Sequence, residues 1–243
     1  MDWHSRYLQQ ARWTAQLRAY LFKKAGLDVT SRVLELGCGT GALLIDFPQQ
    51  NALYGLDINL AALEQVEGHA PNAHLTCGDA SDLPFASSAF DLTFCHFLLL
   101  WVADPQRVVD EMCRITRPGG SVLALAEPDY GGRIDYPVEL AEAGRWQVQS
   151  LRMQGAEPEM GRRLAEIFTR AGLRQVETGV LGGEWKQGQF QSENDLEWLV
   201  LAEDLAGKVP HQSLQSLRNL DALSRERGER VLYVPTFFAW GVV

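Results

Sequence analysis

The chain begins with an amphipathic segment and then changes to short apolar runs. Between residues 5 and 24, apolar side chains recur at spacings of three and four, which predicts a helix. After Gly26 the runs are short and almost wholly apolar, which is typical of strands buried on both faces of a parallel sheet. These runs lie at residues 32–37, 51–58, 73–79, 90–97 and 121–128.

Segments of helical length separate most of these runs, so we expect βαβ units. The expected crossover helices lie at 41–48, 59–68 and 104–116. The second half of the chain is less regular. There we predict helices over 133–155, 161–172, 192–209 and 211–228, and strands over 173–185 and 230–243.

A chain of 243 residues with 46% hydrophobic content can bury one substantial core, so we predict a single domain. The segment at 184–227 is longer than a plain hairpin connection needs. We interpret it as part of a lid over a substrate. The expected parts of the domain are a helical cover at 1–28, a core at 30–128 and lid segments at 129–158 and 184–227.

Net charge and the positions of cysteine and histidine limit the kinds of partner and cofactor that we expect. A formal net charge of −9 disfavours a nucleic-acid partner, because such binding normally needs a clustered basic surface. The four cysteines lack CxxC spacing and the histidines form no HExxH motif, so we expect no metal. The start of the chain does not resemble a secretory signal, and the apolar run at 96–102 is too short to span a bilayer. We therefore expect a cytoplasmic protein.

The site richest in candidate chemistry is Glu-Leu-Gly-Cys-Gly-Thr-Gly at 35–41, directly after a predicted strand. Three glycines in five residues indicate a backbone that turns sharply or lets a ligand approach closely. A tight turn without a ligand needs only one glycine. With Ala42 the loop also fits the dinucleotide pattern G-x-G-x-x-G/A, and Asp57, twenty residues after Gly37, can accept from ribose hydroxyls in either kind of site.

Four motifs together resemble the class I S-adenosylmethionine (SAM)-dependent methyltransferases, in particular their small-molecule and quinone C-methyltransferase branch. They are ELGCGTG at 35–41, GDASDLPF at 78–85, FDLTFCHFLLLWVADP at 90–105 and ITRPGG at 115–120. The resemblance covers about residues 30–128. It implies a Rossmann-like α/β fold with a mostly parallel seven-stranded sheet of order 3-2-1-4-5-7-6, an antiparallel last strand and helices on both faces.

The resemblance also implies contacts to SAM. The backbone of Gly37, Gly39 and Gly41 would meet its methionine and ribose parts, and Asp57 would hold the ribose diol. Asp79 and the Ala80 amide would bind adenine. The remaining candidate cofactor-binding residues are Glu35, Cys38, Ile58 and Cys95.

Methyl transfer from a sulfonium is an in-line displacement with an activated leaving group, so orientation and exclusion of water can supply much of the rate. A general base is needed only when the acceptor must lose a proton. His96, Glu127 and Tyr130 are the candidate catalytic residues, because they follow strands whose carboxyl ends form the ligand-binding edge. For His96 a packing role competes with this interpretation, and for Glu127 and Tyr130 an ordinary turn does.

Two other functions compete with methyl transfer to a small organic acceptor. One is an NAD-dependent oxidoreductase, although the chain contains no Tyr-x-x-x-Lys motif. The other is a SAM-binding regulatory protein without catalysis, because binding and turnover are separable. The sequence leaves open the acceptor, the methylated atom and the oligomeric state.

Overall fold

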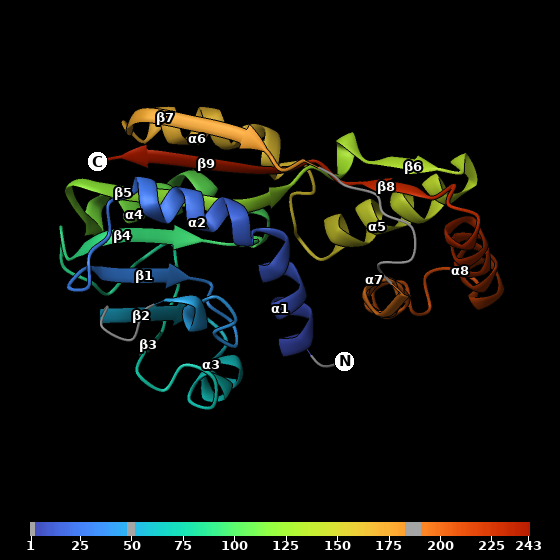
Figure 1. Ribbon diagram of the computed structural model, residues 1–243, viewed down its shortest axis with the longest axis horizontal. Coiled ribbons are helices and arrows are strands. Elements are labelled where there is room, and N and C mark those ends of the chain that lie inside the picture. The colour runs from blue at the N-terminus through green and yellow to red at the C-terminus, as the bar shows by residue number, and fades with distance from the viewer. Residues whose placement is uncertain (1–2, 48–51, 183–190) are drawn as a thin grey trace.

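The computed structural model describes residues 3–47, 52–182 and 191–243 and shows a twisted sheet with a smaller lobe beside it (Figure 1). The sheet has seven strands in the order β3-β2-β1-β4-β5-β9-β7. β9 runs antiparallel to the other six strands, which are parallel to one another. The strands are β1 (Arg32–Leu36), β2 (Ala52–Asp57), β3 (His74–Cys77), β4 (Phe90–Cys95), β5 (Thr116–Pro128), β7 (Arg174–Val180) and β9 (Thr236–Val242).

This architecture confirms the predicted fold. Counted within the sheet alone, β7 is the sixth strand and β9 the seventh, so the order is 3-2-1-4-5-7-6 with the last strand antiparallel. Because β1, β2, β3, β4 and β5 are parallel, their carboxyl ends meet at one edge of the sheet. All the candidate site residues lie on or next to these five strands.

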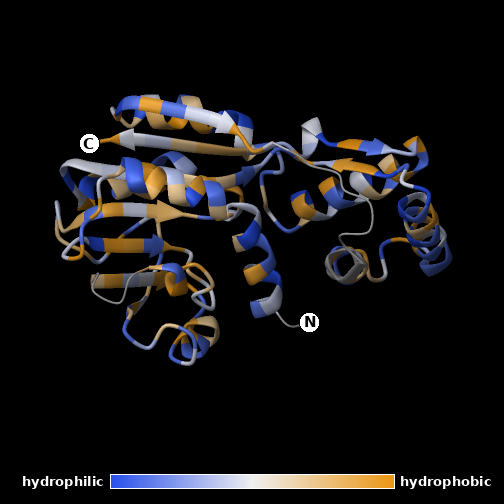
Figure 2. Cartoon of the chain, in the orientation of Figure 1, coloured by the Kyte–Doolittle hydropathy of each residue, from blue (hydrophilic) through white to orange (hydrophobic). Residues whose placement is uncertain are grey.

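Helices cover both faces of the sheet (Figure 1). On one face α4 (Pro105–Ile115) and α6 (Leu164–Arg170) contribute Met112 and Phe168, each fully buried, to a core that includes Leu34 and Val122. On the other, α2 (Ala15–Lys24) places Leu21 against Phe94 and Leu123. The central strands are coloured mainly as hydrophobic in Figure 2. Apolar burial on both faces explains why these strands have continuous apolar sequences.

Local sequence explains where the crossover helices begin. Asn59 caps α3 (Leu60–Val66), and its side chain accepts hydrogen bonds from the amides of Ala61 and Ala62. Asp104 caps α4 by accepting from the Arg107 amide, and Pro105 occupies the first helical position. Both are standard ways of satisfying the unpaired donors at a helix start.

Two expected helices differ from the structure. The segment at 5–24 forms two helices, α1 (Trp3–Trp13) and α2, because the chain turns at Thr14, whose hydroxyl donates to the Ala11 carbonyl at 3.2 Å. In the segment predicted as a helix at 41–48, the described residues 41–47 form only a 3-10 turn, η1 (Leu44–Asp46). Phe47 is extended there (φ −84°, ψ 144°), as the residue before a proline prefers.

Prolines also divide two segments that were each predicted as one element. Residues 133–155 form β6 (Ile134–Tyr136) before Pro137 and the helix α5 (Ala141–Met153) after it. Residues 230–243 form β8 (Val231–Tyr233) and β9 on either side of Pro235. Proline lacks the amide hydrogen that a continuing element needs.

The lobe combines β6, β8 and α5 with α7 (Gln191–Asp204) and α8 (His211–Glu226) (Figure 1). β6 and β8 form their own two-stranded antiparallel sheet. The lobe has a small core of Ala143, Trp198, Leu201 and Leu205. Helix α8 at its outer end is coloured mainly as hydrophilic (Figure 2). The start of the predicted segment 184–227 lies outside the described residues, since positions 183–190 are among those not described.

Candidate active site at the carboxyl edge of the sheet

The glycine loop, residues 37–41, directly follows β1. Gly37, Gly39 and Gly41 have φ values of 69°, 51° and 78°, a region that side chains other than glycine disfavour. Space is also limited, because a Cβ at Gly37 would lie 2.9 Å from Leu98 Cδ1 and one at Gly41 2.9 Å from Val66 Cγ1. Conformation and packing therefore both demand the glycines that the sequence analysis singled out.

Asp57 at the end of β2 holds this loop in place. Its Oδ2 accepts from the Gly39 amide at 2.8 Å and its Oδ1 from the Asn59 amide at 2.8 Å. The side chain is half-buried, and a carboxylate oxygen can accept more than one hydrogen bond. The next residue, Ile58, is 73% exposed at the same edge. Asp57 and Ile58 are thus next to the glycine loop, where the resemblance places the ribose.

Glu35 in β1 is buried just before the loop, and its Oε2 has no hydrogen-bond partner; it is the one such buried side-chain atom among the described residues. Burial raises its pKa well above the usual range, and the Arg18 guanidinium offsets part of this effect. An unpartnered buried carboxylate is costly unless a donor or a cation satisfies it. The ammonium group of SAM's methionine part supplies both, so the residues present fit this cofactor.

Cys38 and Cys95 are buried side chains. A Cβ at Gly55 would lie 2.8 Å from Cys38 Sγ, so this thiol packs against β2. Cys95 belongs to the core on the α4 side of the sheet. Burial raises the pKa of both thiols. Both side chains are therefore neutral and packed in the core, and their predicted contacts with SAM stay a prediction.

The first helix lies across the glycine loop. Tyr7 Cε2 would be 3.1 Å from a Cβ at Gly39, and burial together with the nearby Asp57 raises the pKa of this tyrosine. His4 Nδ1 lies 2.7 Å from Thr40 Oγ1, and the His4 ring stacks on His69 at 3.6 Å. The sequence analysis expected a cover over 1–28 but did not assign these contacts, whose partners are 32 to 65 positions apart in the chain.

Asp79 and Ala80 follow β3. Asp79 Oδ1 accepts from both the amide and the hydroxyl of Ser81, each at 2.8 Å, and these bonds lower the pKa of the exposed carboxyl. Ala80 is buried. Asp79 is therefore ionised and fixed in a turn, with its side chain at the surface where an adenine amine can reach it.

His96 lies at the end of β4 and bridges to the first two helices. Its Nε2 is 3.2 Å from Thr14 Oγ1, and Thr14 also accepts from Arg18 Nη1 at 2.5 Å. Burial, with a smaller effect of the Arg18 charge, lowers the pKa of His96 to about 3. The imidazole is therefore neutral, and such a low basicity limits what it contributes as a general base near neutral pH.

Glu127 and Tyr130 are at the end of β5. The Glu127 carboxylate accepts three backbone amides, from Leu98 at 3.0 Å, Leu99 at 2.8 Å and Leu100 at 3.1 Å. Burial raises its pKa to about 7, and the three amides act in the opposite direction. This side chain fixes the turn after β4, and its predicted catalytic role stays a prediction.

Tyr130 is half-buried and its amide donates to Pro158 at 2.8 Å. Burial is the main cause that raises its pKa to about 12, so the phenol is protonated. It also lines a cavity of about 650 Å³ between the turn after β5 and α5. The structure thus brings His96, Glu127 and Tyr130 to one edge of the sheet, but two of the three already have partners within the protein.

No helix in the described ranges is both long and apolar enough to cross a bilayer. In the same part of the chain, no group of three or more histidine, cysteine or acidic residues is arranged to hold a metal ion.

Comparison with known proteins agrees with this geometry. Residues 34–124 match the family described as a methyltransferase domain. Over 120 residues the chain is 32% identical to the demethylmenaquinone methyltransferase of Paenarthrobacter aurescens, covering 49% of this chain and 46% of that protein. Over 97 residues it is 38% identical to the malonyl-[acyl-carrier protein] O-methyltransferase of Methylococcus capsulatus, covering 37% and 35%. The chain thus spans about half the length of such relatives, or less.

Solved structures share the fold over most of the chain. Phosphoethanolamine N-methyltransferase 2 of Haemonchus contortus, solved with SAM, superposes with a TM-score of 0.60 at 16% identity, covering 93% of this chain and 52% of that one. The [4+2]-cyclase SpnF gives 0.56 at 16% identity, covering 93% and 80%. Residues 34–124 thus match a methyltransferase domain, as the sequence motifs indicated, and the solved structures share the Rossmann-like fold.

Proposed function

We propose that the protein binds SAM at the glycine loop and transfers its methyl group to a small organic acceptor. The observation that carries this proposal is the pairing of a loop with three glycines at positive φ with Glu35, a buried carboxyl whose Oε2 lacks a partner. A purely structural turn needs neither feature. The match of residues 34–124 to the methyltransferase domain family supports the same function.

In this proposal each part of the cofactor has a chemically suited neighbour. The glycine backbone admits the methionine and ribose parts, Glu35 receives the ammonium group, and Asp57 accepts from the ribose hydroxyls. Asp79 and the Ala80 amide bind the adenine edge. When bound, SAM supplies a methyl group on a positively charged sulfur that leaves readily, so the protein has mainly to orient the acceptor and exclude water.

The covering elements suit that task. Tyr7 lies over Gly39, and Arg6 on the same helix forms a 2.8 Å ion pair with Glu197 of α7. This pair joins the segment 1–28 to the lobe. We assign the lobe segments at 129–158 and 184–227, with the first helix, as the lid that closes over the acceptor.

The acceptor side has a protonated phenol and a neutral imidazole rather than a strong base. Tyr130 can donate a hydrogen bond that orients an acceptor, and the neutral His96 ring is held by Thr14. The two relatives are named for a quinone precursor and a carrier-bound acid, so the domain itself does not select the acceptor. SpnF, named as a cyclase, shows that the fold also accommodates other chemistry.

Calorimetric titration with SAM, NAD and NADP tests the proposal. We expect SAM to bind and the nicotinamide cofactors not to bind. Asp57→Ala should weaken SAM binding by roughly tenfold to a hundredfold, the value of hydrogen bonds to a charged group. The matched control is Asp110→Ala, which removes an exposed aspartate on α4. Nicotinamide binding, or equal SAM affinities of the two variants, would contradict the proposal.

A second measurement separates an enzyme from a SAM-binding regulatory protein. The wild-type protein is incubated with SAM and a small-molecule extract, and formation of S-adenosylhomocysteine is followed. An enzyme forms it in an extract-dependent manner. A regulatory protein binds SAM with no turnover in any extract.

A further inference from the structure

The cavity beside Tyr130 is unusually basic for this protein. It has a volume of about 650 Å³, and its lining includes Arg133, Arg145 and Arg152 but only one acidic residue, Asp135. The whole chain has the opposite balance, with 22 basic and 31 acidic residues. A concentration of arginine in the cavity of an acidic protein points to a ligand of negative charge.

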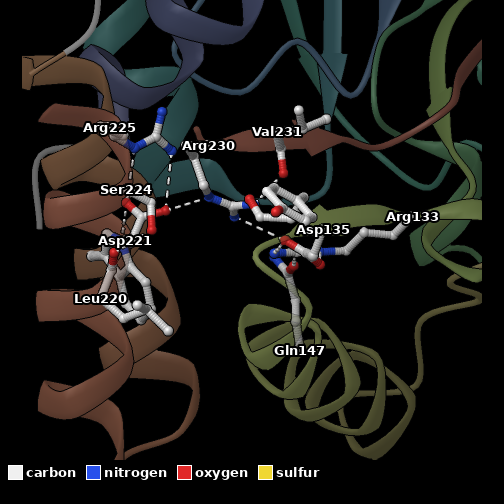
Figure 3. A network of polar contacts seen from close by, with 11 residues as sticks. Arg133, Asp135, Gln147, Leu220, Asp221, Ser224, Arg225, Arg230 and Val231 are labelled. Atoms are coloured by element: carbon white, nitrogen blue, oxygen red, sulfur yellow. Dashed lines mark hydrogen bonds and ion pairs between the residues drawn. The ribbon is translucent and has the colours of Figure 1, made fainter. Parts of the chain in front are cut away.

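Asp135 cannot neutralise the other arginines of this cavity, because it already pairs with two arginines. Asp135 accepts from Arg133 Nε at 2.6 Å and from Arg230 Nη2 at 2.8 Å, as the close view shows (Figure 3). Arg230 in turn binds Asp221, and Asp221 also pairs with Arg225. This connected network therefore holds three arginines and two aspartates, and it leaves no negative charge for Arg145 or Arg152.

Arg145 and Arg152 lie on one face of α5, seven positions apart, with Val148 between them. The Arg145 side chain makes no hydrogen bond or ion pair with any part of the chain that the structure describes. Arg152 has a 3.6 Å contact to Glu159, which Arg162 shares at 3.4 Å. That contact is solvent-exposed and weak, so both arginines are available to a ligand.

Apart from Gln149, the other side chains of the lining are largely apolar, and one end of the cavity lies at Tyr130, close to the carboxyl edge of the sheet. Val148, Met153 and Ala141 contribute hydrocarbon surface. Tyr130 directly follows β5, and its phenol lies within the electrostatic influence of Arg6 on the first helix and Glu197 on α7. Tyr130 thus lines this cavity and also lies near the elements that cover the glycine loop.

We propose that the acceptor is an amphiphilic oxyanion, with its anionic group held by Arg145 and Arg152 and its apolar part packed against Val148, Met153 and the Tyr130 ring. This assignment of substrate class rests on the proposed methyl transfer. The anionic group is a binding handle, and the methylated atom lies at the other end, toward the glycine loop. Carboxylate, sulfonate and phosphate share the geometry that arginine recognises.

Two fluorescent probes with the same aromatic framework test the charge requirement. The first, 8-anilinonaphthalene-1-sulfonate, is an amphiphilic oxyanion, and the second, N-phenyl-1-naphthylamine, lacks the sulfonate. We expect the Arg145→Gln/Arg152→Gln variant to bind the sulfonate probe roughly tenfold more weakly and the neutral probe within about twofold of wild type. The control, Arg170→Gln/Arg227→Gln, removes two exposed arginines elsewhere and should leave both affinities unchanged.

Displacement of the sulfonate probe identifies the kind of anion. 3-Phenylpropionate and phenyl phosphate are each compared with 3-phenylpropanol, which has no charge. Displacement by either anion but not by the alcohol supports the proposal and names the preferred group. Absence of sulfonate-probe binding to wild type, equal effects of the two double variants, or equal displacement by the alcohol would overturn it.

Titration of the same variants with SAM keeps this test separate from the proposed function. None of the exchanged arginines contacts the glycine loop, so SAM affinity should stay within about twofold of wild type, the value of a remote surface charge. If wild type binds the sulfonate probe in an arginine-dependent way but does not bind SAM, the anion site stands and the methyltransferase proposal fails. If wild type binds SAM but does not bind the sulfonate probe in an arginine-dependent way, the methyltransferase proposal stands and the anion site fails.

Discussion

Replacing Glu35 by glutamine should make the free protein more stable and the cofactor complex weaker. The side chain is 2% exposed, and its Oε2 has no hydrogen-bond partner. Burial raises its pKa well above the unfolded value of about 4.3. Above pH 4.3 the unfolded chain therefore releases a proton that the folded protein retains.

The sign of the pH effect follows from that proton. Because the folded state holds more protons, stability falls as the pH rises, by at most about 1.4 kcal/mol per pH unit from this group, until the folded pKa is reached. Glutamine has nearly the same shape and does not titrate. The Glu35→Gln variant should thus lack this part of the slope, and at pH 8 it should exceed wild type by about 1–3 kcal/mol, the cost of an unsatisfied buried group.

Urea denaturation at pH 5 and pH 8 measures the difference, and a thermal scan should show a rise of roughly 2–4 °C per kcal/mol for a chain of this size. Glu64→Gln on the exposed surface of α3 is the matched control and should be neutral at both pH values. A variant less stable than wild type at pH 8, or a difference that does not change with pH, would refute the reasoning.

Bound SAM should favour the ionised form of Glu35, which burial disfavours in the free protein. A cation bound beside Glu35 stabilises the carboxylate, so SAM binding should release protons. The affinity for SAM should therefore rise with pH until the pH reaches the pKa of Glu35 in the free protein. Calorimetry in two buffers of different ionisation enthalpy measures the release. In Glu35→Gln the release should vanish, and SAM affinity should fall by roughly tenfold. Proton release that persists in the variant would assign it to another group.

Three further predictions concern residues at the same edge and in the lobe. Glu127→Ala leaves the amides of residues 98–100 without their acceptor, and we expect the free energy of unfolding in urea to fall by about 3 kcal/mol or more. Glu127→Gln should lose less. An alanine variant as stable as wild type would contradict this prediction. His96 has a folded pKa of about 3, so its side chain binds a proton in the unfolded chain first as the pH falls below about 6.5. Stability should therefore decline below that pH by up to about 1.4 kcal/mol per pH unit. NMR should show a neutral ring at pH 5, and a protonated ring would contradict the burial argument. Arg230→Met removes the buried guanidinium that joins Asp135 to Asp221 and leaves each carboxylate with one arginine partner. We expect about 3–5 kcal/mol of destabilisation with faster hydrogen exchange in β6 and α8, whereas unchanged exchange would mean that the network is dispensable.

The sheet could be predicted from the sequence because its signal is local. Each parallel strand is one apolar run, and the glycine loop marks where β1 ends. The turn at Thr14 could not be predicted, since the apolar spacing continues through it and the bond to His96 joins positions 82 residues apart. Pro137 and Pro235 are visible in the sequence and mark where two predicted elements divide.

The candidate site was predictable in position but less so in role. Every cofactor candidate lies at the carboxyl edge of β1, β2, β3 or β4, as parallel topology requires. The sequence makes Glu127 a catalytic candidate because it lies at the end of the fifth predicted strand. Only the fold shows that its carboxylate accepts hydrogen bonds from the amides of residues 98–100. The arginines of the Tyr130 cavity become a group only when α5 places Arg145 and Arg152 on one face and β6 brings Arg133 beside it.

The lobe is connected to the edge of the large sheet, but its strands β6 and β8 are not part of that sheet. Its strands β6 and β8 pair only with each other, and the chain passes to β9 at Pro235 without adding lobe residues to the large sheet. The family match likewise ends at residue 124, just before the lobe begins. Under the proposed function, a change of acceptor therefore needs substitutions in the lobe, while the large sheet and the glycine loop stay as they are.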